Sequence, residues 1–318
     1  MAAATCVVGA ASAILAMTTD KGGRLDGEDT HVVITGGSSG IGKAMAVEMA
    51  RMGAQVTVVA RGAEALARVV DEVPDGDNLH VEVADVADFG AVQAAFRRAR
   101  NKFGPVTMLV CAAGFAAPSR FVDAPVDDAH AMVQANYLGA LHASKAAYED
   151  VEAAGQRGRI MLVASQAAQV GVFGMAAYSG TKWALRGFAE ALAMELAPSG
   201  ARVCVAFPPD TDTPGFANEE IGKPEETRYI TGSDKPWKPE DVARRLVKGL
   251  LRGDFQVSCG LEGWALATLT CGFAPPNSLL GALGEVFLLG ILRVVALVLR
   301  ATWTRKVKQM SATEKATG

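Results

Sequence analysis

The chain has few aromatic residues, few cysteines and no excess of basic charge. Aromatic side chains make up 6% of the 318 residues, and 34 glycines suit close packing of helices against a sheet. The net charge is −3, whereas nucleic-acid-binding proteins usually carry an excess of basic residues. The five cysteines, at positions 6, 111, 204, 259 and 271, show neither metal-ligand spacing nor an even disulfide framework. The sequence therefore predicts no metal site, no nucleic-acid partner, and buried thiols in a reducing compartment.

Two apolar segments at the ends of the chain divide it into three predicted regions. Residues 2–17 are small and uncharged, but these sixteen residues fall short of the ~20 that a membrane-spanning helix needs. A weak anchor, a signal-like segment and a loosely packed terminus stay open, although no basic stretch precedes them as in a cleaved signal. We predict an apolar N-terminal segment and linker over 1–30, a catalytic domain over 31–260, and a membrane-associated segment with a basic tail over 261–318.

The C-terminal region contains a strongly apolar run, residues 279–299. Only Glu285 and Arg293 interrupt it, and basic residues follow at positions 300, 305, 306 and 308. A charge near the centre of a bilayer costs about 2.5–3.5 kcal/mol, so Arg293 favours an interfacial or re-entrant helix over a simple span. A core or dimer-interface helix is the alternative. Because basic residues follow both apolar segments, the catalytic domain is expected on the cytosolic face of a membrane.

Between these ends, short apolar runs alternate with helical patterns. The pattern over 177–197 repeats leucine or phenylalanine at positions 185, 188, 192 and 196, and it stops at Pro198 and Gly200. Such alternation predicts an α/β fold, a doubly wound parallel sheet (Rossmann fold) with an apolar, membrane-associated C-terminal segment. Strands are expected over 31–35, 55–60, 79–83, 106–111, 159–164, 201–206 and 255–258, and helices over 41–52, 87–103, 128–154 and 177–197.

A glycine-rich turn follows the first expected strand. Its glycines permit a tight turn in which backbone N–H groups approach a pyrophosphate at the start of the next helix. Such a loop alone is a weak signal, but its place between a strand and a helix makes it a strong one. We therefore predict a dinucleotide site at Gly36, Ser38, Ser39, Gly40, Ile41 and Gly42.

The second expected strand leads into Arg61, nineteen residues past Gly42. An NAD site usually has an acid here for the ribose 2′-hydroxyl group, whereas a guanidinium group can hold a 2′-phosphate with two hydrogen bonds. The sequence therefore predicts NADPH as the cofactor, with Ser38, Ser39 and Lys43 as further donors. Arg61 as a solvated loop cation is the alternative.

Two more strand ends carry candidates for cofactor binding. Asp85 and Val86 follow the third expected strand, where the carboxylate can accept a hydrogen bond from the adenine amino group. Asp85 is almost equally suited to cap the helix that begins just beyond it. Ala113 and Gly114 follow the fourth expected strand, and their small size lets a cofactor lie close to the backbone.

A tyrosine and a lysine four residues apart form the catalytic candidate. Tyr178 and Lys182 share one face of an expected helix, so the ammonium group can lie under the phenol. The phenol ordinarily titrates near ~10, and the lysine together with an oxidised nicotinamide would lower that pKa. Ser165, thirteen residues before Tyr178, can orient a carbonyl oxygen. We expect ketone reduction or alcohol oxidation, with Tyr178 as proton donor, Lys182 also holding the nicotinamide ribose, and Asn136 holding a water that relays protons to Lys182.

These motifs resemble the short-chain dehydrogenase/reductase family over roughly residues 31–260. The resemblance rests on TGGSSGIG at 35–42, AAG at 112–114, Asn136, Ser165 and YSGTK at 178–182. It implies further cofactor contacts from Pro208 and Thr211, and a homo-oligomer. The chain departs from many members at Cys111, where they carry asparagine.

Less common motifs resemble a branch of this family that acts on a long-chain lipid. They are SQAAQVGVFGMAAYSGTKWALRG at 165–187, FPPDTDTPGFANE at 207–219 and GLEGWALATLTCGFAP at 260–275. This resemblance implies NADPH-dependent reduction of 3-ketosphinganine to sphinganine, in sphingolipid synthesis at the cytosolic face of the endoplasmic reticulum membrane. Residues 210–238, rich in proline, glycine and charge, are typical of a mobile lid, and 279–299 would border the path of the lipid tail.

Three other interpretations stay open on the sequence alone. The first is a membrane-associated short-chain reductase of another lipid ketone, such as a steroid, a retinoid or a fatty acyl chain. The second is a non-catalytic scaffold that binds NADPH or lipid, against which the intact serine, tyrosine and lysine set argues. The third is a structural membrane protein, for which only residues 279–299 argue.

Overall fold

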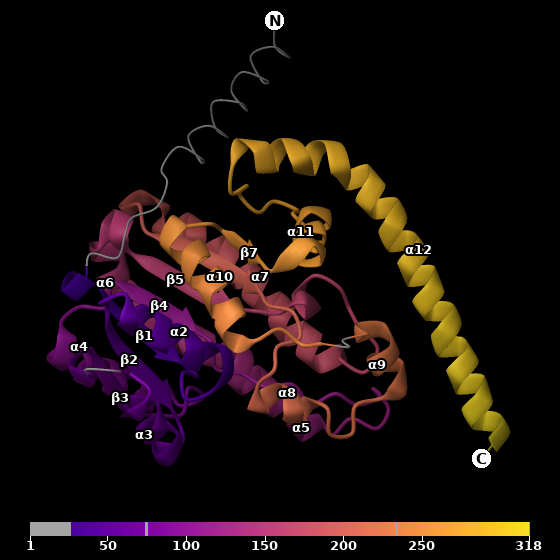
Figure 1. Ribbon diagram of the computed structural model, residues 1–318, viewed down its shortest axis with the longest axis horizontal. Helices are drawn as coiled ribbons and strands as arrows, with labels where there is room; N and C mark the ends of the chain where they lie inside the picture. The colour runs from indigo at the N-terminus through magenta and orange to yellow at the C-terminus, as the bar shows by residue number, and fades with distance from the viewer. Residues whose placement is uncertain (1–26, 74–75, 233–234, 318) are drawn as a thin grey trace, which may run out of the picture.

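A single parallel sheet forms the centre of the computed structural model, which describes residues 27–73, 76–232 and 235–317. Its seven strands follow the order β3-β2-β1-β4-β5-β6-β7 (Figure 1). They are β1 His31–Thr35, β2 Gln55–Ala60, β3 Leu79–Val83, β4 Met108–Cys111, β5 Arg159–Val163, β6 Arg202–Phe207 and β7 Gln256–Ser258. Every strand begins within two residues of its predicted start, because apolar runs bounded by turn residues mark buried strands clearly.

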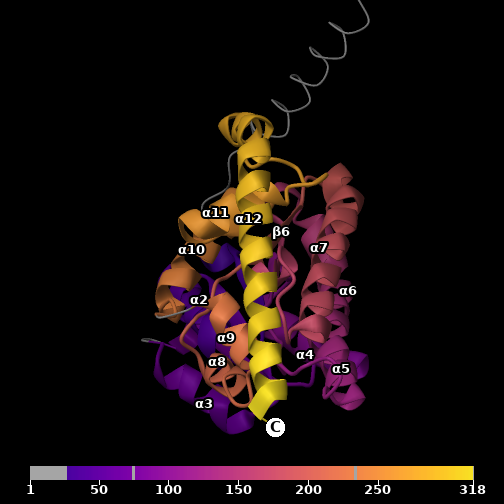
Figure 2. The same ribbon diagram turned by 90° about the vertical axis from the view of Figure 1, so that its right-hand side faces the viewer.

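Helices cover both faces of the sheet, as the doubly wound prediction requires. They are α2 Gly40–Arg51, α3 Ala63–Asp71, α4 Phe89–Phe103, α5 Val126–Met132, α6 Gly139–Ala153, α7 Ala176–Leu196, α8 Pro214–Glu219, α9 Glu225–Thr231, α10 Pro239–Arg252, α11 Gly260–Leu269 and α12 Leu279–Thr317. In Figure 2, α2 and α10 lie on one side, and α4, α6 and α7 on the other. The α/β fold class is confirmed.

Two apolar cores lie on the two faces of the sheet. Val32 and Ile34 of β1 belong to the core under α2 and α10, whereas Val33 belongs to the core under α4, α6 and α7. Alternate residues of a strand point to opposite faces, so a strand that is covered on both sides must be apolar throughout. Cys111 and Cys204 lie in these cores, and all four cysteines within the described residues carry free thiols.

The helix predicted over 128–154 is interrupted. A π-helical segment, Val133–Leu138, separates α5 from α6. The side chain of Asn136 in this segment bonds to the loop after β4 and to α7. Close packing also requires glycine at position 139, because an added Cβ would lie 2.6 Å from the side chain of Val86. A π-helical turn contains one residue more than an α-helical turn, and hydrophobic periodicity in the sequence does not reveal it. Such insertions are frequent at functional sites.

The last helix, α12, lies apart from the sheet along one side of the molecule (Figures 1 and 2). Within the described residues, it is the one helix long and apolar enough to cross a membrane, judged by length and composition. The most apolar part of it is not buried, which excludes the alternative of a core helix. Residues 2–17 lie outside the described residues, and the division at 30 and 260 stays a prediction.

Candidate active site

A cavity of about 1800 Å³ lies at the carboxyl ends of the strands and extends to α12. Loops that follow β1 to β6 line it, together with the start of α7. In doubly wound sheets, ligands bind at this edge, next to the point where the strand order reverses between β1 and β4. All but one of the predicted site residues line it: Gly36, Ser38, Ser39, Gly40, Ile41, Gly42, Arg61, Asp85, Val86, Ala113, Gly114, Ser165, Tyr178, Lys182, Pro208 and Thr211.

The glycine-rich turn brings backbone close to backbone. Gly36 has φ +71°, and a Cβ added there would lie 2.5 Å from the main chain of Ala113. A Cβ on Gly42 would lie 2.5 Å from the carbonyl oxygen of Gly36. Ser39 precedes α2 in an extended conformation, so the free N–H groups of the first turn open toward the cavity. A pyrophosphate fits this cradle, since helix N-termini favour negative charge.

Arg61 lies in the cavity wall just after β2, with its side chain exposed. This is the place from which a cation reaches a 2′-phosphate. Lys43 is a weaker candidate than expected, because its ammonium group pairs with Glu72 at 2.8 Å. Ser38 and Ser39 remain beside Arg61 as donors from the glycine-rich turn.

Asp85 does not cap the helix that follows it. Helix α4 begins at Phe89, and its cap is Asp88, whose carboxylate accepts from the backbone N–H of Ala91. Asp85 instead accepts from the N–H of Ala87 at 2.9 Å and lines the cavity. The helix-capping role that the sequence left open for Asp85 therefore belongs to Asp88.

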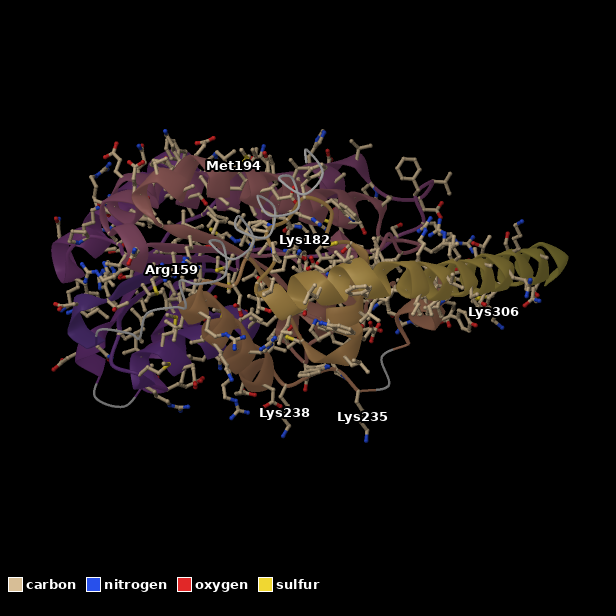
Figure 3. The ribbon with its side chains drawn as sticks, turned by 90° about the horizontal axis from the view of Figure 1, so that it is seen from above. Arg159, Lys182, Met194, Lys235, Lys238 and Lys306 are labelled. Carbon is tan, nitrogen blue, oxygen red and sulfur yellow. The ribbon has the colours of Figure 1, made fainter. Side chains whose placement is uncertain are left out.

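The catalytic candidates meet where β5 and α7 approach each other. The Ser165 hydroxyl group begins the short turn after β5, accepts from the N–H of Ala167 at 3.1 Å, and hydrogen-bonds to Tyr178. The Nζ atom of Lys182 lies 5.7 Å from the centroid of the Tyr178 ring and donates to the Val163 carbonyl oxygen at 3.0 Å. Figure 3 shows Lys182 in the interior, whereas Met194 of the same helix lies at the outer surface.

The protein groups around Tyr178 raise its pKa, opposite in direction to the expectation. Burial is the largest cause, and the negative charges of Glu219 and Asp210 add to it, while the hydrogen bond from Ser165 opposes it. Lys182 directs its ammonium group to Val163 rather than to the phenol oxygen. The raised pKa keeps the proton on Tyr178 at neutral pH, which is the form that an acid catalyst needs.

Burial lowers the pKa of Lys182 to about 8, from an ordinary value of 10.5. The penalty on folding is complete below pH 8 and absent above pH 10.5, so stability rises as pH increases through this window. Lys182→Met should raise the unfolding free energy at neutral pH by about 1–3 kcal/mol, after allowance for the lost bond to Val163. Urea unfolding of both proteins across that window measures it, and the gain should vanish near pH 10.5. A gain that did not depend on pH would contradict the assignment.

Asn136 lies behind the cavity wall and is only 1% exposed. Its Oδ1 accepts from the N–H of Phe115, and its Nδ2 donates to the Phe115 carbonyl oxygen and to the Thr181 hydroxyl group. Thr181 in turn donates to the carbonyl oxygen of Tyr178 at 2.7 Å. Asn136 therefore joins the loop after β4 to the turn that carries Tyr178. The water relay expected of this residue stays a prediction.

Residues 210–238, expected as a lid, contain α8 and α9, which sequence reasoning missed. Thr213 caps α8, and Pro214 occupies its first turn, a pairing that is a usable helix-start signal. Glu219 at the end of α8 lines the cavity and pairs with the buried Lys223 at 3.1 Å. Gln169, also missed, is a lining residue of the cavity four residues after Ser165, and its side-chain amide is buried.

Comparison with known proteins agrees with this geometry. The model of the short chain dehydrogenase family matches residues 30–223. The chain therefore belongs to the short-chain dehydrogenase family, a class of oxidoreductases, as its motifs predicted. It is similar to the 3-ketodihydrosphingosine reductase of Bos taurus, with 43% identity over 273 residues, which cover 84% of this chain and 82% of the relative.

Two solved structures share the fold. One is the 3-ketoacyl-(acyl-carrier-protein) reductase from Brucella melitensis, complexed with NADH, with a TM-score of 0.62 and 28% identity over 70% of this chain and 90% of that one. The other is an alcohol dehydrogenase from the archaeon Thermococcus sibiricus, complexed with 5-hydroxy-NADP, with a TM-score of 0.62 and 26% identity over 72% of this chain and 93% of that one.

Proposed function

We propose that this protein reduces 3-ketosphinganine to sphinganine with NADPH, at the cytosolic face of the endoplasmic reticulum membrane. The observation that carries the proposal is one cavity that joins three parts: the glycine-rich turn, the Ser165, Tyr178 and Lys182 set, and an apolar wall from α12. The bovine relative, named for the same reaction, supports the choice of substrate. The homo-oligomer that the family resemblance implies stays a prediction.

The site fits a nicotinamide dinucleotide, which is the cofactor in both similar structures. The first turn of α2 would hold the pyrophosphate, and Asp85 and Val86 would hold the adenine. Arg61 would bind the 2′-phosphate that distinguishes NADPH from NADH. Ala113, Gly114, Pro208 and Thr211 line the same cavity as Lys182 and would border the nicotinamide ring. When bound, the cofactor supplies a hydride to the carbonyl carbon of the substrate.

Tyr178, Ser165 and Lys182 would complete the reduction. Ser165 donates a hydrogen bond to the ketone oxygen and fixes it beside the phenol. Tyr178 transfers its proton to that oxygen as the carbon accepts the hydride, so that the C=O bond becomes CH–OH. Lys182 lies under the phenol ring, where its ammonium group stabilises the phenolate that remains and can hold the nicotinamide ribose.

Helix α12 presents two apolar faces. Leu292, Ala296, Leu299 and Trp303 line the cavity, at helical spacing. Phe287, Ile291, Val294 and Val298, here called the outer stripe, are 61% to 74% exposed. We propose that the outer stripe contacts membrane lipid while the inner face borders the lipid tail of the substrate.

Polar contacts hold α12 over the cavity at two points. The Arg300 guanidinium group donates to the Gly171 carbonyl oxygen at 3.5 Å, and the Lys306 ammonium group lies 5.5 Å from the centroid of the Tyr229 ring. Arg293, the charged residue within the apolar run, lines the cavity. Its charge would therefore not have to enter lipid when α12 lies against a membrane.

The function is tested by following NADPH consumption with 3-ketosphinganine and identifying the product by mass. Sphinganine is expected, with no comparable rate on a ketosteroid, a retinal or a 3-ketoacyl substrate. A higher kcat/KM for one of those ketones would instead identify a reductase of another lipid. If no ketone were reduced while NADPH still bound, the proposal of a reductase would fail.

Charging the outer stripe should separate membrane binding from catalysis. Phe287→Glu with Ile291→Glu is expected to shift the protein from the membrane to the soluble fraction, because each carboxylate costs about 2–3 kcal/mol in an apolar interface. Turnover of a short, soluble ketone should persist, since neither side chain lines the cavity. Fractionation and kinetics measure both effects.

The matched control is Met52→Glu with Val70→Glu, which charges two exposed apolar residues at the end of α2 and in α3 instead of on α12. It should leave membrane binding unchanged. Because residues 2–17 can also hold the protein, the comparison is made with and without them. If the charged protein lacking 2–17 stayed on the membrane, α12 would not be the contact.

A further inference from the structure

Glu219, the last residue of α8, is an acidic residue of the cavity wall that acts on Tyr178. Helix α8 begins over the glycine-rich turn, since the Thr213 side chain that caps it lies 2.9 Å from the place of a Cβ on Gly40. Glu219 lines the cavity, and 14% of its side chain is exposed. Burial is the largest cause of the raised pKa of Tyr178, and the charge of Glu219 is the second. Glu219 therefore combines an accessible side chain with a charge that reaches the proposed proton donor.

The cation that pairs with Glu219 is shared with a second carboxylate. The Nζ atom of Lys223 lies 3.1 Å from Glu219 and 2.6 Å from Glu220. Burial raises the pKa of Glu219, and the charge of Lys223 opposes this rise without cancelling it. A carboxylate whose pKa stays raised beside a lysine is incompletely compensated. A further cation in the cavity would therefore stabilise its ionised form.

The proposed substrate carries such a cation beside the reacting carbon. In 3-ketosphinganine, the carbon next to the ketone carries an ammonium group, whose nitrogen is three bonds from the ketone oxygen. When that oxygen accepts from Tyr178, the nitrogen lies within about 6 Å of the phenol oxygen. Among the acidic residues that line the cavity in the described part of the chain, Glu219 acts most strongly on this phenol. The ammonium group and the carboxylate thus occupy the same end of the cavity.

We propose that Glu219 binds the ammonium group of the substrate and thereby selects a 2-amino-3-keto lipid over other long-chain ketones. This inference rests on the proposed function and extends it from the reaction to the recognition of the head group. Binding also joins selection to catalysis, because the ammonium group offsets the negative charge that holds the proton on Tyr178. A ketone without the amino group leaves that charge in place, so its reduction is slower.

The test compares 3-ketosphinganine with the analogue that lacks only its amino group. Glu219→Gln keeps the size of the side chain and removes its charge, while Lys223 keeps its pairing with Glu220. The kcat/KM for 3-ketosphinganine should fall by about 10- to 100-fold, the size expected for a lost hydrogen bond to a charged group. The kcat/KM for the analogue should stay the same or rise, because the charge that opposes proton release is gone. Damage to the fold would instead slow both substrates.

A conservative variant and a matched control complete the experiment. Glu219→Asp keeps the charge and should lose less activity on 3-ketosphinganine than Glu219→Gln. Glu220→Gln removes the other carboxylate on Lys223, outside the cavity lining, and changes the net charge equally. This control should leave the ratio of kcat/KM between the two substrates within about twofold.

Each contrary result has its own meaning. A ratio that Glu219→Gln leaves unchanged would overturn the inference while the proposed function still stands. An equal fall in Glu220→Gln would also overturn it, because the effect would then belong to the net charge of the cluster. If the wild-type protein reduced the analogue as well as 3-ketosphinganine, head-group selection would be absent and the inference would fail. If it reduced neither, the proposed function and this inference would fail together.

Discussion

Tyr178→Phe is expected to lower kcat by about 10²- to 10⁴-fold, the range associated with general acid catalysis. The phenylalanine ring keeps the packing of the start of α7, so the loss reports the hydroxyl proton alone. NADPH binding should persist, because the glycine-rich turn and Arg61 do not touch the phenol. Steady-state kinetics and a fluorescence titration with NADPH measure the two quantities.

Tyr137→Phe provides the control for this experiment. Tyr137 is partly buried, and its ring packs against Phe188 at a centroid distance of 6.3 Å. Removing its hydroxyl group should change kcat by less than about twofold, as for a substitution outside the site. If Tyr178→Phe kept more than about a tenth of wild-type kcat, which is a loss below ~1.4 kcal/mol, another group must donate the proton.

Arg61→Asp is expected to lower the preference for NADPH over NADH by about 10²-fold or to invert it. The substitution removes a charge-assisted contact with the 2′-phosphate, worth about 1.5–3 kcal/mol, and adds a carboxylate that repels it. The same carboxylate can accept from the ribose 2′-hydroxyl group of NADH. The ratio of kcat/KM for the two cofactors, measured with one ketone, gives the result.

Arg68→Asp on α3 makes the same change of charge outside the cavity lining, and it should leave this ratio within about twofold. The comparison separates a local contact from a general effect of net charge. Unchanged selectivity in Arg61→Asp would move the 2′-phosphate site to the serines of the glycine-rich turn. It would leave the binding of a nicotinamide dinucleotide itself untouched.

Most of the fold could be predicted because its local signals agree with its tertiary structure. The strands of a sheet covered on both faces are apolar throughout, so β1 and β2 match their predicted spans. Where the backbone alone forms the site, as at Gly36 and Gly42, the residue type itself reports the close approach that only glycine permits. The spacing of Tyr178 and Lys182 likewise sets their shared helix face before any packing occurs.

Apart from α8, whose start carries a local signal, the main failures of prediction concern contacts between residues far apart in the chain. The π-helical segment depends on Asn136 reaching both Phe115 and Thr181, and periodicity within one helix carries no trace of such partners. The pKa of Tyr178 depends on its burial and on Glu219, which lies on α8. Lys43 is occupied by Glu72 from the end of α3.

The sequence by itself determined the sheet, the dinucleotide turn and the serine, tyrosine and lysine set, because each follows from short-range spacing and side-chain type. Only the tertiary structure decided how α12 is used. Its sequence is apolar around much of the helix, so composition could not say which side faces the cavity and which faces outward. Packing over α9 and α11 made that choice. Burial and pairing are properties of three-dimensional neighbours, which no local pattern contains.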